Sequence, residues 1–449
     1  MNRLLAVLCF VVGIAMMILG FPEGFAALAT VVICSAVVIT IIRQQVREEA
    51  DFLVQLFLIA LLVRLVFGIF IHIFDLREFF GADSQFYDSL GVRLTEIWYG
   101  DTNTNDSLAQ RAMRMSGPGW GMNYLVGLIY LLLGRNIFAA QSFCAVIGAA
   151  TAPLIYRCAY EIFGNRQASK TSAFLVALYP ALIIWSGQLI KDGLIIFLLV
   201  LAVTMVLQLQ RKFSYISAAL LVFSLFGILS LRFYIFYMVT IAVVGSFVIG
   251  FSNSPSAILK RVIVLIIIGL SLTYLGVIQN AGDDIEQYGN LEMVQRSRNY
   301  LSESESGFGS DLDVSTTVGA ITALPVGFTY LIFAPFPWQI NNFRQAITLP
   351  EVLLWWASIP LLISGLWYTI KYRLRASIAV LIFTLMLTVV YSVFQGNVGT
   401  AYRQRTQIQV FLFMFIAVGW TLIQERRENK KLLMLQKRQQ MNKRLRKDD

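Results

Sequence analysis

Charged residues are scarce in this chain: Asp, Glu, Lys and Arg make up 14% of its 449 residues, and 57% are hydrophobic. Soluble globular domains carry about 25% charged residues, so the composition excludes that class. His72 is the single histidine, which excludes a histidine-clustered metal site and most imidazole chemistry. The four cysteines include no Cys-x-x-Cys pair, so we expect neither a disulfide framework nor a thiolate metal site.

Two further patterns are missing. The chain has no series of alternating ten-residue segments, as found in membrane β-barrels, and no internal repeat of the kind common in transporters. Apolar runs of about 17–25 residues recur instead, long enough to cross the membrane as helices. We therefore predict an all-α, polytopic transmembrane helical bundle with about twelve spans. The predicted spans are residues 4–20, 25–42, 52–74, 138–160, 170–186, 190–209, 214–230, 233–250, 262–278, 352–370, 376–394 and 406–423.

The predicted organisation has three parts. Residues 1–50 form two N-terminal spans, residues 51–423 form the main transmembrane domain with outer loops 75–137 and 279–351, and residues 424–449 form a basic cytoplasmic tail. The tail carries ten Lys or Arg against four acidic residues, so we expect it to bind anionic lipids of the inner leaflet. Because the basic excess is spread over loops and tail, we expect no nucleic-acid partner.

Lys and Arg collect on one side of the predicted bundle. The positive-inside rule makes that side cytoplasmic and places both termini of this multi-pass protein there. Two apolar stretches, residues 124–133 and 318–334, would break this pattern if each crossed alone. We predict that they are re-entrant or interfacial helices. The basic segments are residues 43–47, 166–170, 211–212, 260–261 and 371–375, and the tail from residue 426.

Two carboxylates, Asp83 and Asp88, follow the apolar run Phe52–Phe74. A carboxylate at the mouth of a span is costly unless it faces water or a site. If the segment begins a helix, Asp83 and Tyr87 share one face and Asp88 points elsewhere. The alternative is an ordinary polar loop in which Asp83 caps a helix and Asp88 lies on the surface.

A second candidate segment is the turn that ends in Lys191-Asp192 between two predicted spans. We expect Lys191 or Gln188 to bind an anionic group that Asp192 orients. The alternative is an interface anchor followed by a helix cap.

Three arginines lie on the predicted outer side, where the topology rule disfavours positive charge. They are Arg232 in a tight turn and Arg403 and Arg405 at the start of the last span. Guanidinium groups bind phosphate through a planar fork of donors, so these residues are candidate phosphate contacts. The alternative is ion pairing with the acidic loop 279–317, whose composition suggests a mobile lid or a solvated excursion. Metal chelation by Asp283-Asp284 in that loop is unspecific and not favoured, and we expect no cofactor.

With these residues the chain resembles a GT-C type glycosyltransferase of the bacterial family 39-like group, whose members are integral membrane enzymes that use a polyprenyl-phosphate sugar. The resemblance covers roughly residues 50–210. Two hydrophobic segments precede the first outer loop here, and a second acid after Asp83 is missing, which argues against a metal-dependent version. The motifs are Asp83 and Tyr87, then Pro118, Trp120 and Tyr124, Leu-Leu-Gly-Arg-Asn at 132–136, Phe-Gly-Asn-Arg-Gln-Ala at 163–168, and the Tyr-Pro…Ser…Lys-Asp run at 179–192.

The resemblance implies a GT-C-like bundle in a bacterial inner membrane and makes Asp83 the catalytic base. The expected reaction moves a sugar from a polyprenyl-phosphate donor to a glycan, lipid or protein acceptor at the outer membrane face, with inversion. The alternatives are an O-antigen polymerase or ligase, and a transporter or flippase, for which Arg64 inside the third span is the nearest sign. The expected substrate-binding residues are Tyr87, Asp88, Gln188, Lys191, Asp192, Arg232, Arg403 and Arg405.

Overall fold

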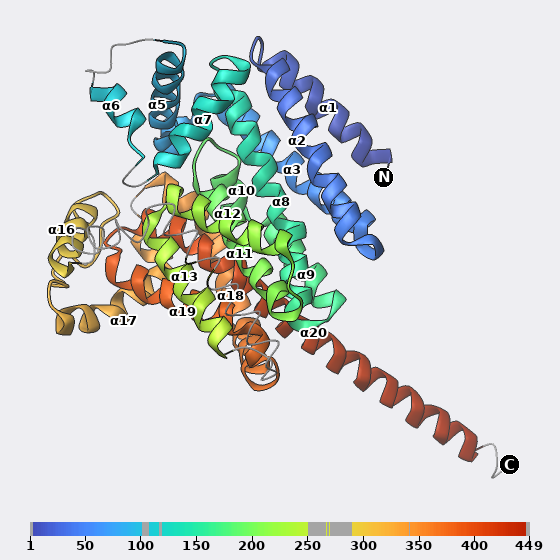
Figure 1. Ribbon diagram of the computed structural model, residues 1–449. Coiled ribbons are helices and arrows are strands. Elements are labelled where there is room, and N and C mark those ends of the chain that lie inside the picture. The colour runs from blue at the N-terminus through green and yellow to red at the C-terminus, as the bar shows by residue number, and fades with distance from the viewer. Residues whose placement is uncertain are drawn as a thin grey trace.

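A computed structural model describes residues 3–100, 107–115, 119–249, 266, 269, 290–340 and 342–445. Within these residues the regular elements are helical, apart from one isolated bridge between Gly307 and Asn397. Figure 1 shows their arrangement. The elements are α1 (Arg3–Leu19), α2 (Gly24–Gln45), η1 (Arg47–Glu49), α3 (Ala50–Ile73), α4 (Arg77–Gly81), α5 (Asp83–Trp98), α6 (Ser107–Met113), α7 (Trp120–Leu133), α8 (Ile137–Phe163), α9 (Arg166–Leu178), α10 (Pro180–Ser186), α11 (Asp192–Arg211), α12 (Tyr215–Leu231), α13 (Phe233–Ile249), α16 (Leu291–Ser302), α17 (Thr317–Phe333), η2 (Pro337–Gln339), α18 (Phe343–Tyr372), α19 (Leu374–Phe394) and α20 (Val398–Leu445).

Seven helical segments among the described residues are long and apolar enough to cross a membrane: α2, α3 with η1, α8, α11, α18, α19 and the first part of α20. An eighth results if α9 and α10, bent by 55°, form one broken span. This confirms the prediction of a polytopic helical bundle. The number of about twelve spans stays a prediction, because α1, α12 and α13 are shorter than a full crossing. The predicted span 262–278 lies almost entirely outside the described residues.

The two stretches predicted as re-entrant or interfacial form α7 and α17, and both are shorter apolar helices. The last carbonyl groups of a helix have no partner inside it. At the end of α17, Arg405 of α20 donates from Nη1 to the carbonyl oxygens of Ile332 and Ala334, at 2.8 Å each. Arg405 therefore attaches the end of α17 to the bundle.

The predicted span 170–186 is broken at Tyr179-Pro180, because proline cannot continue the hydrogen-bond pattern of α9. Arg64 of α3 satisfies groups on both sides of this break. Its Nη1 donates to the carbonyl oxygen of Ala177 at 2.9 Å, and its Nε donates to Ser186 Oγ at 2.7 Å. Arg64 is fully buried, so the one charge inside the third span stabilises a helix break.

A substitution in α8 tests how tightly this break is packed. A Cβ on Gly148 would lie 2.3 Å from the Cβ of Ser186 and 3.3 Å from Nε of Arg64. We expect Gly148→Ala to lower the free energy of unfolding by about 1–3 kcal/mol, the usual cost of overpacking. The measurement is reversible unfolding in mixed micelles. Gly13→Ala is the control, because its Cβ would meet only Leu28 at 3.6 Å. Equal stability of the two variants would contradict the prediction.

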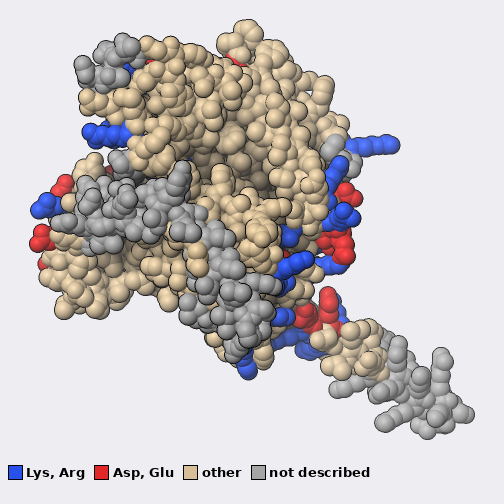
Figure 2. All heavy atoms as spheres, in the orientation of Figure 1, with Lys and Arg blue, Asp and Glu red and all other residues tan. Residues whose placement is uncertain are grey.

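Charged residues gather at one end of the bundle. Figure 2 shows most of the visible Lys, Arg, Asp and Glu along the edge toward which α2 and the exposed part of α20 run, and a smaller group on the left edge of the view, whereas most of the visible face carries other residues. Ion pairs join the elements there: Arg166 pairs with Glu48, and Lys170 pairs with Glu49 at 2.8 Å. The structure thus brings together basic segments that the sequence placed on one side.

Candidate functional site

The segment after α3 folds into the five-residue helix α4 and the longer helix α5, which begins at Asp83. Asp83 is the first residue of α5, and the N-cap position is Ala82, so Asp83 does not cap the helix. Its side chain is 47% exposed. Tyr87 lies one turn further along α5 and is buried, as the spacing of the two residues predicted. Asp83 is therefore an accessible carboxylate beside a buried hydroxyl.

Asp192 is the buried centre of the site. It begins α11, directly after the irregular segment 187–191, and its side chain is 0% exposed. A buried carboxylate requires paired charges or hydrogen bonds. Arg403 Nε donates to Asp192 Oδ2 at 2.8 Å, and Arg232 Nη2 lies 3.4 Å from Asp192 Oδ1. Segments that are 40 and 211 residues apart along the chain meet here.

Arg403 also joins this centre to the start of α5. Its Nη2 lies 2.5 Å from Asp192 Oδ2 and 2.8 Å from Asp83 Oδ2. One guanidinium group thus bridges two carboxylates, one buried and one accessible. The acidic loop was the alternative partner for the outer arginines. Among the described residues, the recorded ion pairs of Arg232 and Arg403 are with Asp192 and Asp83.

Lys191 and Tyr87 converge on the backbone of Gly119. The Nζ atom of Lys191 and the hydroxyl oxygen of Tyr87 lie 2.8 and 3.4 Å from the point that a Cβ on Gly119 would occupy. Gly119 has a φ of +86°, a conformation that favours glycine. Burial and the nearby Arg232 lower the pKa of Lys191 to about 8. Burial, reinforced by Asp83 and Asp192, raises the pKa of Tyr87.

The charges of the site do not cancel when Lys191 is protonated. Three cationic side chains, Lys191, Arg232 and Arg403, surround two carboxylates, Asp83 and Asp192. The balance is one positive charge, at the N-terminal end of α11, where the helix dipole also favours an anion. The arrangement suits an anionic group next to an accessible base.

Three predicted site residues lie elsewhere or act on the backbone. Asp88 is bound by Tyr130 at 2.6 Å and by Arg135 Nη2 at 2.7 Å. Gln188 is buried and donates to the carbonyl oxygen of Ile184 at 2.8 Å. Arg405 donates its hydrogen bonds to the carbonyl groups at the end of α17, as described above. The structure therefore groups Asp83, Tyr87, Lys191, Asp192, Arg232 and Arg403. Asp88 is paired with Arg135 instead, the amide nitrogen of Gln188 is bound to the backbone of Ile184, and Arg405 holds the end of α17.

The described part of the acidic loop packs beside this group. The amide of Phe308 donates to the carbonyl oxygen of Gly396 at 2.7 Å, and the amide of Val398 donates to that of Ser306 at 2.9 Å. Arg298 of α16 donates to the carbonyl oxygens of Val393 and Gln395 at 2.9 and 2.8 Å. This part of the loop is thus attached to the α19–α20 turn, a few residues before Arg403.

Sequence reasoning missed one residue at the group, Trp185, and one that binds Tyr402, the residue before Arg403. The guanidinium carbon of Arg403 lies 5.5 Å from the ring centroid of Trp185, a cation–π distance. The buried indole nitrogen of Trp185 has no hydrogen-bond partner within the described residues. Glu351 of α18 is buried and accepts a hydrogen bond from Tyr402 at 2.7 Å. An acid at the edge of the predicted span 352–370 was the available signal for Glu351.

The described residues contain no group of three His, Cys, Asp or Glu side chains that would hold a metal ion. Asp283 and Asp284, the unspecific metal candidates, lie outside the described residues. No protein-family model, curated protein or solved structure matches the chain. The helices define the class: this is a polytopic α-helical membrane protein.

Proposed function

We propose that this protein is a membrane glycosyltransferase of the GT-C-like kind, which moves a sugar from a polyprenyl-phosphate donor to an acceptor. The observation that supports this function most directly is the bridge from Asp83 through Arg403 to Asp192. It sets an accessible carboxylate beside a fixed guanidinium group, as transfer from a phosphate-linked sugar requires.

In the proposed reaction the acceptor hydroxyl oxygen attacks the anomeric carbon of the donor sugar. The bond between that carbon and the phosphate oxygen breaks as the new glycosidic bond forms, and the acceptor proton passes to the Asp83 carboxylate. Polyprenyl phosphate leaves as an anion, so a second protein acid is not needed. Direct displacement inverts the anomeric centre, by analogy with inverting glycosidases.

Arg403, Arg232 and Lys191 are the proposed phosphate contacts. Without donor, Arg403 is paired with Asp83. A donor phosphate that binds Arg403 would compete with Asp83 and release that carboxylate to act as base. Asp192 would stay buried beneath Arg403 and Arg232 and hold both guanidinium groups in place. We leave Arg405 out of this set because it binds the end of α17.

The proposed setting is a bacterial inner membrane with both termini in the cytoplasm. The ion-paired basic end of the bundle would face the cytoplasm, and the Asp83 group at the other end would face outward. The acceptor would be a glycan, a lipid or a protein, and the basic tail on α20 would contact membrane lipids.

The experiment uses the full chain in nanodiscs with a radiolabelled polyprenyl-phosphate sugar. Release of polyprenyl phosphate or transfer of label to an acceptor would support the function. Activity only with diphosphate-linked oligosaccharides would favour an O-antigen polymerase or ligase. A transporter or flippase would move the lipid across the membrane without releasing polyprenyl phosphate or transferring label. Arg64, its main sign in the sequence, is engaged with Ala177 and Ser186.

The pH dependence of kcat/KM tests the role of Lys191. A phosphate contact requires the ammonium form, and burial lowers the pKa of Lys191 from 10.5 to about 8. We expect kcat/KM, which reports the free enzyme, to fall as the pH rises through about 8. Lys191→Arg should extend the plateau to higher pH. Folding favours the neutral amine, so this residue's contribution to stability grows between pH 8 and 10.5, opposite to the activity. An unchanged profile in Lys191→Arg would contradict the role.

A further inference from the structure

A cavity lies on the other side of α5 from Asp83. It has a volume of about 530 Å³, within the range of ligand-binding pockets. At 100° per residue, Asp83 and Tyr87 lie within about 40° of each other, whereas Gln85 and Ser89 point to the opposite side. Its lining residues are Glu23, Arg77, Gln85, Asp88, Ser89, Arg135 and Ile137.

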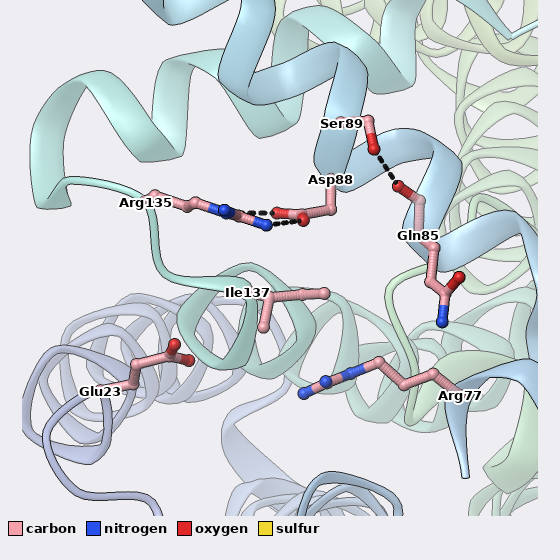
Figure 3. Close-up of a pocket in the computed structure, with 7 residues that line it drawn as sticks. All are labelled: Glu23, Arg77, Gln85, Asp88, Ser89, Arg135 and Ile137. Atoms are coloured by element: carbon pink, nitrogen blue, oxygen red, sulfur yellow. Dashed lines mark hydrogen bonds and ion pairs between the residues drawn. The ribbon is translucent and has the colours of Figure 1, made fainter. Parts of the chain in front are cut away.

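The charged side chains that line this cavity have a net charge of zero. Two carboxylates, Glu23 and Asp88, are balanced by two guanidinium groups, Arg77 and Arg135. Figure 3 shows Glu23 and Arg77 reaching in from opposite sides, with Gln85 pointing toward Arg77. A phosphate would meet the carboxylates and a cation would meet the guanidinium groups. A neutral ligand with many hydroxyl groups fits, because each hydroxyl both donates and accepts hydrogen bonds.

One wall of the cavity is fixed before any ligand binds. Asp88 is buried and is held by Tyr130 at 2.6 Å and by Arg135 Nη2 at 2.7 Å. On another side, Arg77 Nη2 lies 2.6 Å from Nδ1 of His72. The buried Nε of Arg77 has no hydrogen-bond partner in the described part of the chain. Side chains held in place reduce the entropy lost on binding.

We propose that this cavity binds a neutral oligosaccharide, the acceptor of the transfer reaction. The proposal rests on the function proposed above and names its acceptor class. A helix with its side chains is about 10–12 Å across, so a saccharide held here must pass around the N-terminal end of α5 to reach Asp83. A chain of linked sugars reaches farther along such a path than a single sugar does. Asp88 then belongs to the acceptor subsite and Asp83 to the reacting centre.

The test measures binding by titration calorimetry on the full chain in nanodiscs, without donor. The probes are neutral linear tri- to pentasaccharides of glucose, galactose, mannose and N-acetylglucosamine, with inorganic phosphate for comparison. We expect saccharide binding that Glu23→Gln weakens about tenfold or more, because a charged hydrogen bond is lost. Ser89→Trp should abolish binding by filling the cavity without removing a charge. Glu78→Gln is the matched control, since Glu78 is exposed and does not line the cavity.

Three results would overturn the proposal: no saccharide binds, phosphate binds more tightly than every saccharide, or Glu78→Gln weakens binding as much as Glu23→Gln. Donor cleavage by the unmodified protein is measured separately. If it cleaves donor and binds no saccharide, the acceptor subsite is wrong and the proposed function stands. If it binds saccharide and cleaves no donor, the proposed function is wrong and the saccharide site stands.

Discussion

Asp83→Asn is expected to reduce sugar transfer about a hundredfold to ten-thousandfold, the range that general-base catalysis contributes. An amide cannot take up the acceptor proton. The substitution preserves the size of the side chain, and the side chain is 47% exposed, so we expect little change in folding. The measurement is initial transfer rate at saturating donor, with unfolding followed in parallel.

The control for this substitution is Glu78→Gln, which removes an exposed carboxylate five residues upstream on α4. It should keep the rate of the unmodified protein. A second readout separates a base from a residue that only positions Arg403: donor binding should survive in Asp83→Asn, because the phosphate contacts remain. Full transfer activity in Asp83→Asn would show that Asp83 is not the base.

Apolar runs predicted the membrane-spanning helices well, because a helix that crosses the membrane requires a long uninterrupted run of apolar residues. The prediction failed to resolve residues 170–186, where Pro180 divides one apolar run into α9 and α10. Arg64 stabilises this break by donating hydrogen bonds to groups that lie more than 100 residues away from it in the sequence. Such a long-range hydrogen bond leaves no local pattern.

The candidate site was predicted in part. The sequence indicated Arg232 and Arg403, through positive charge on the predicted outer side, and Asp192 separately. That both arginines pair with Asp192 required the structure. Arg403 and Arg405 received the same role from the sequence. Two residues apart on a helix, they point about 200° from each other, and the structure places one at Asp192 and the other at the end of α17. Helical geometry applied to α20 would have separated them.

Breaking the ion pair between Arg403 and the buried Asp192 is expected to have the largest effect on stability. Removing one partner of a buried ion pair leaves an uncompensated charge and costs about 3–5 kcal/mol. Asp192 is 0% exposed, so Arg403→Met leaves it with Arg232 at 3.4 Å as its recorded ion-pair partner among the described residues. Asp192→Asn removes the recorded ion-pair partner of Arg232 among the described residues and leaves Arg403 with the accessible Asp83 as its countercharge. Unfolding of each variant in mixed micelles gives the two free energies.

The double variant Asp192→Asn with Arg403→Met tests whether the two residues stabilise the fold through their interaction with each other. If the residues stabilise the fold through each other, the double variant loses less stability than the sum of the single losses. Replacing Glu48 and Arg166, an exposed pair at the basic end, should change stability far less, because water screens it. Additive losses at Asp192 and Arg403 would mean that the two residues act independently. Asp192 would then not hold Arg403 beside Asp83, and the proposed exchange of Arg403 from Asp83 to a donor phosphate would lose its fixed anchor.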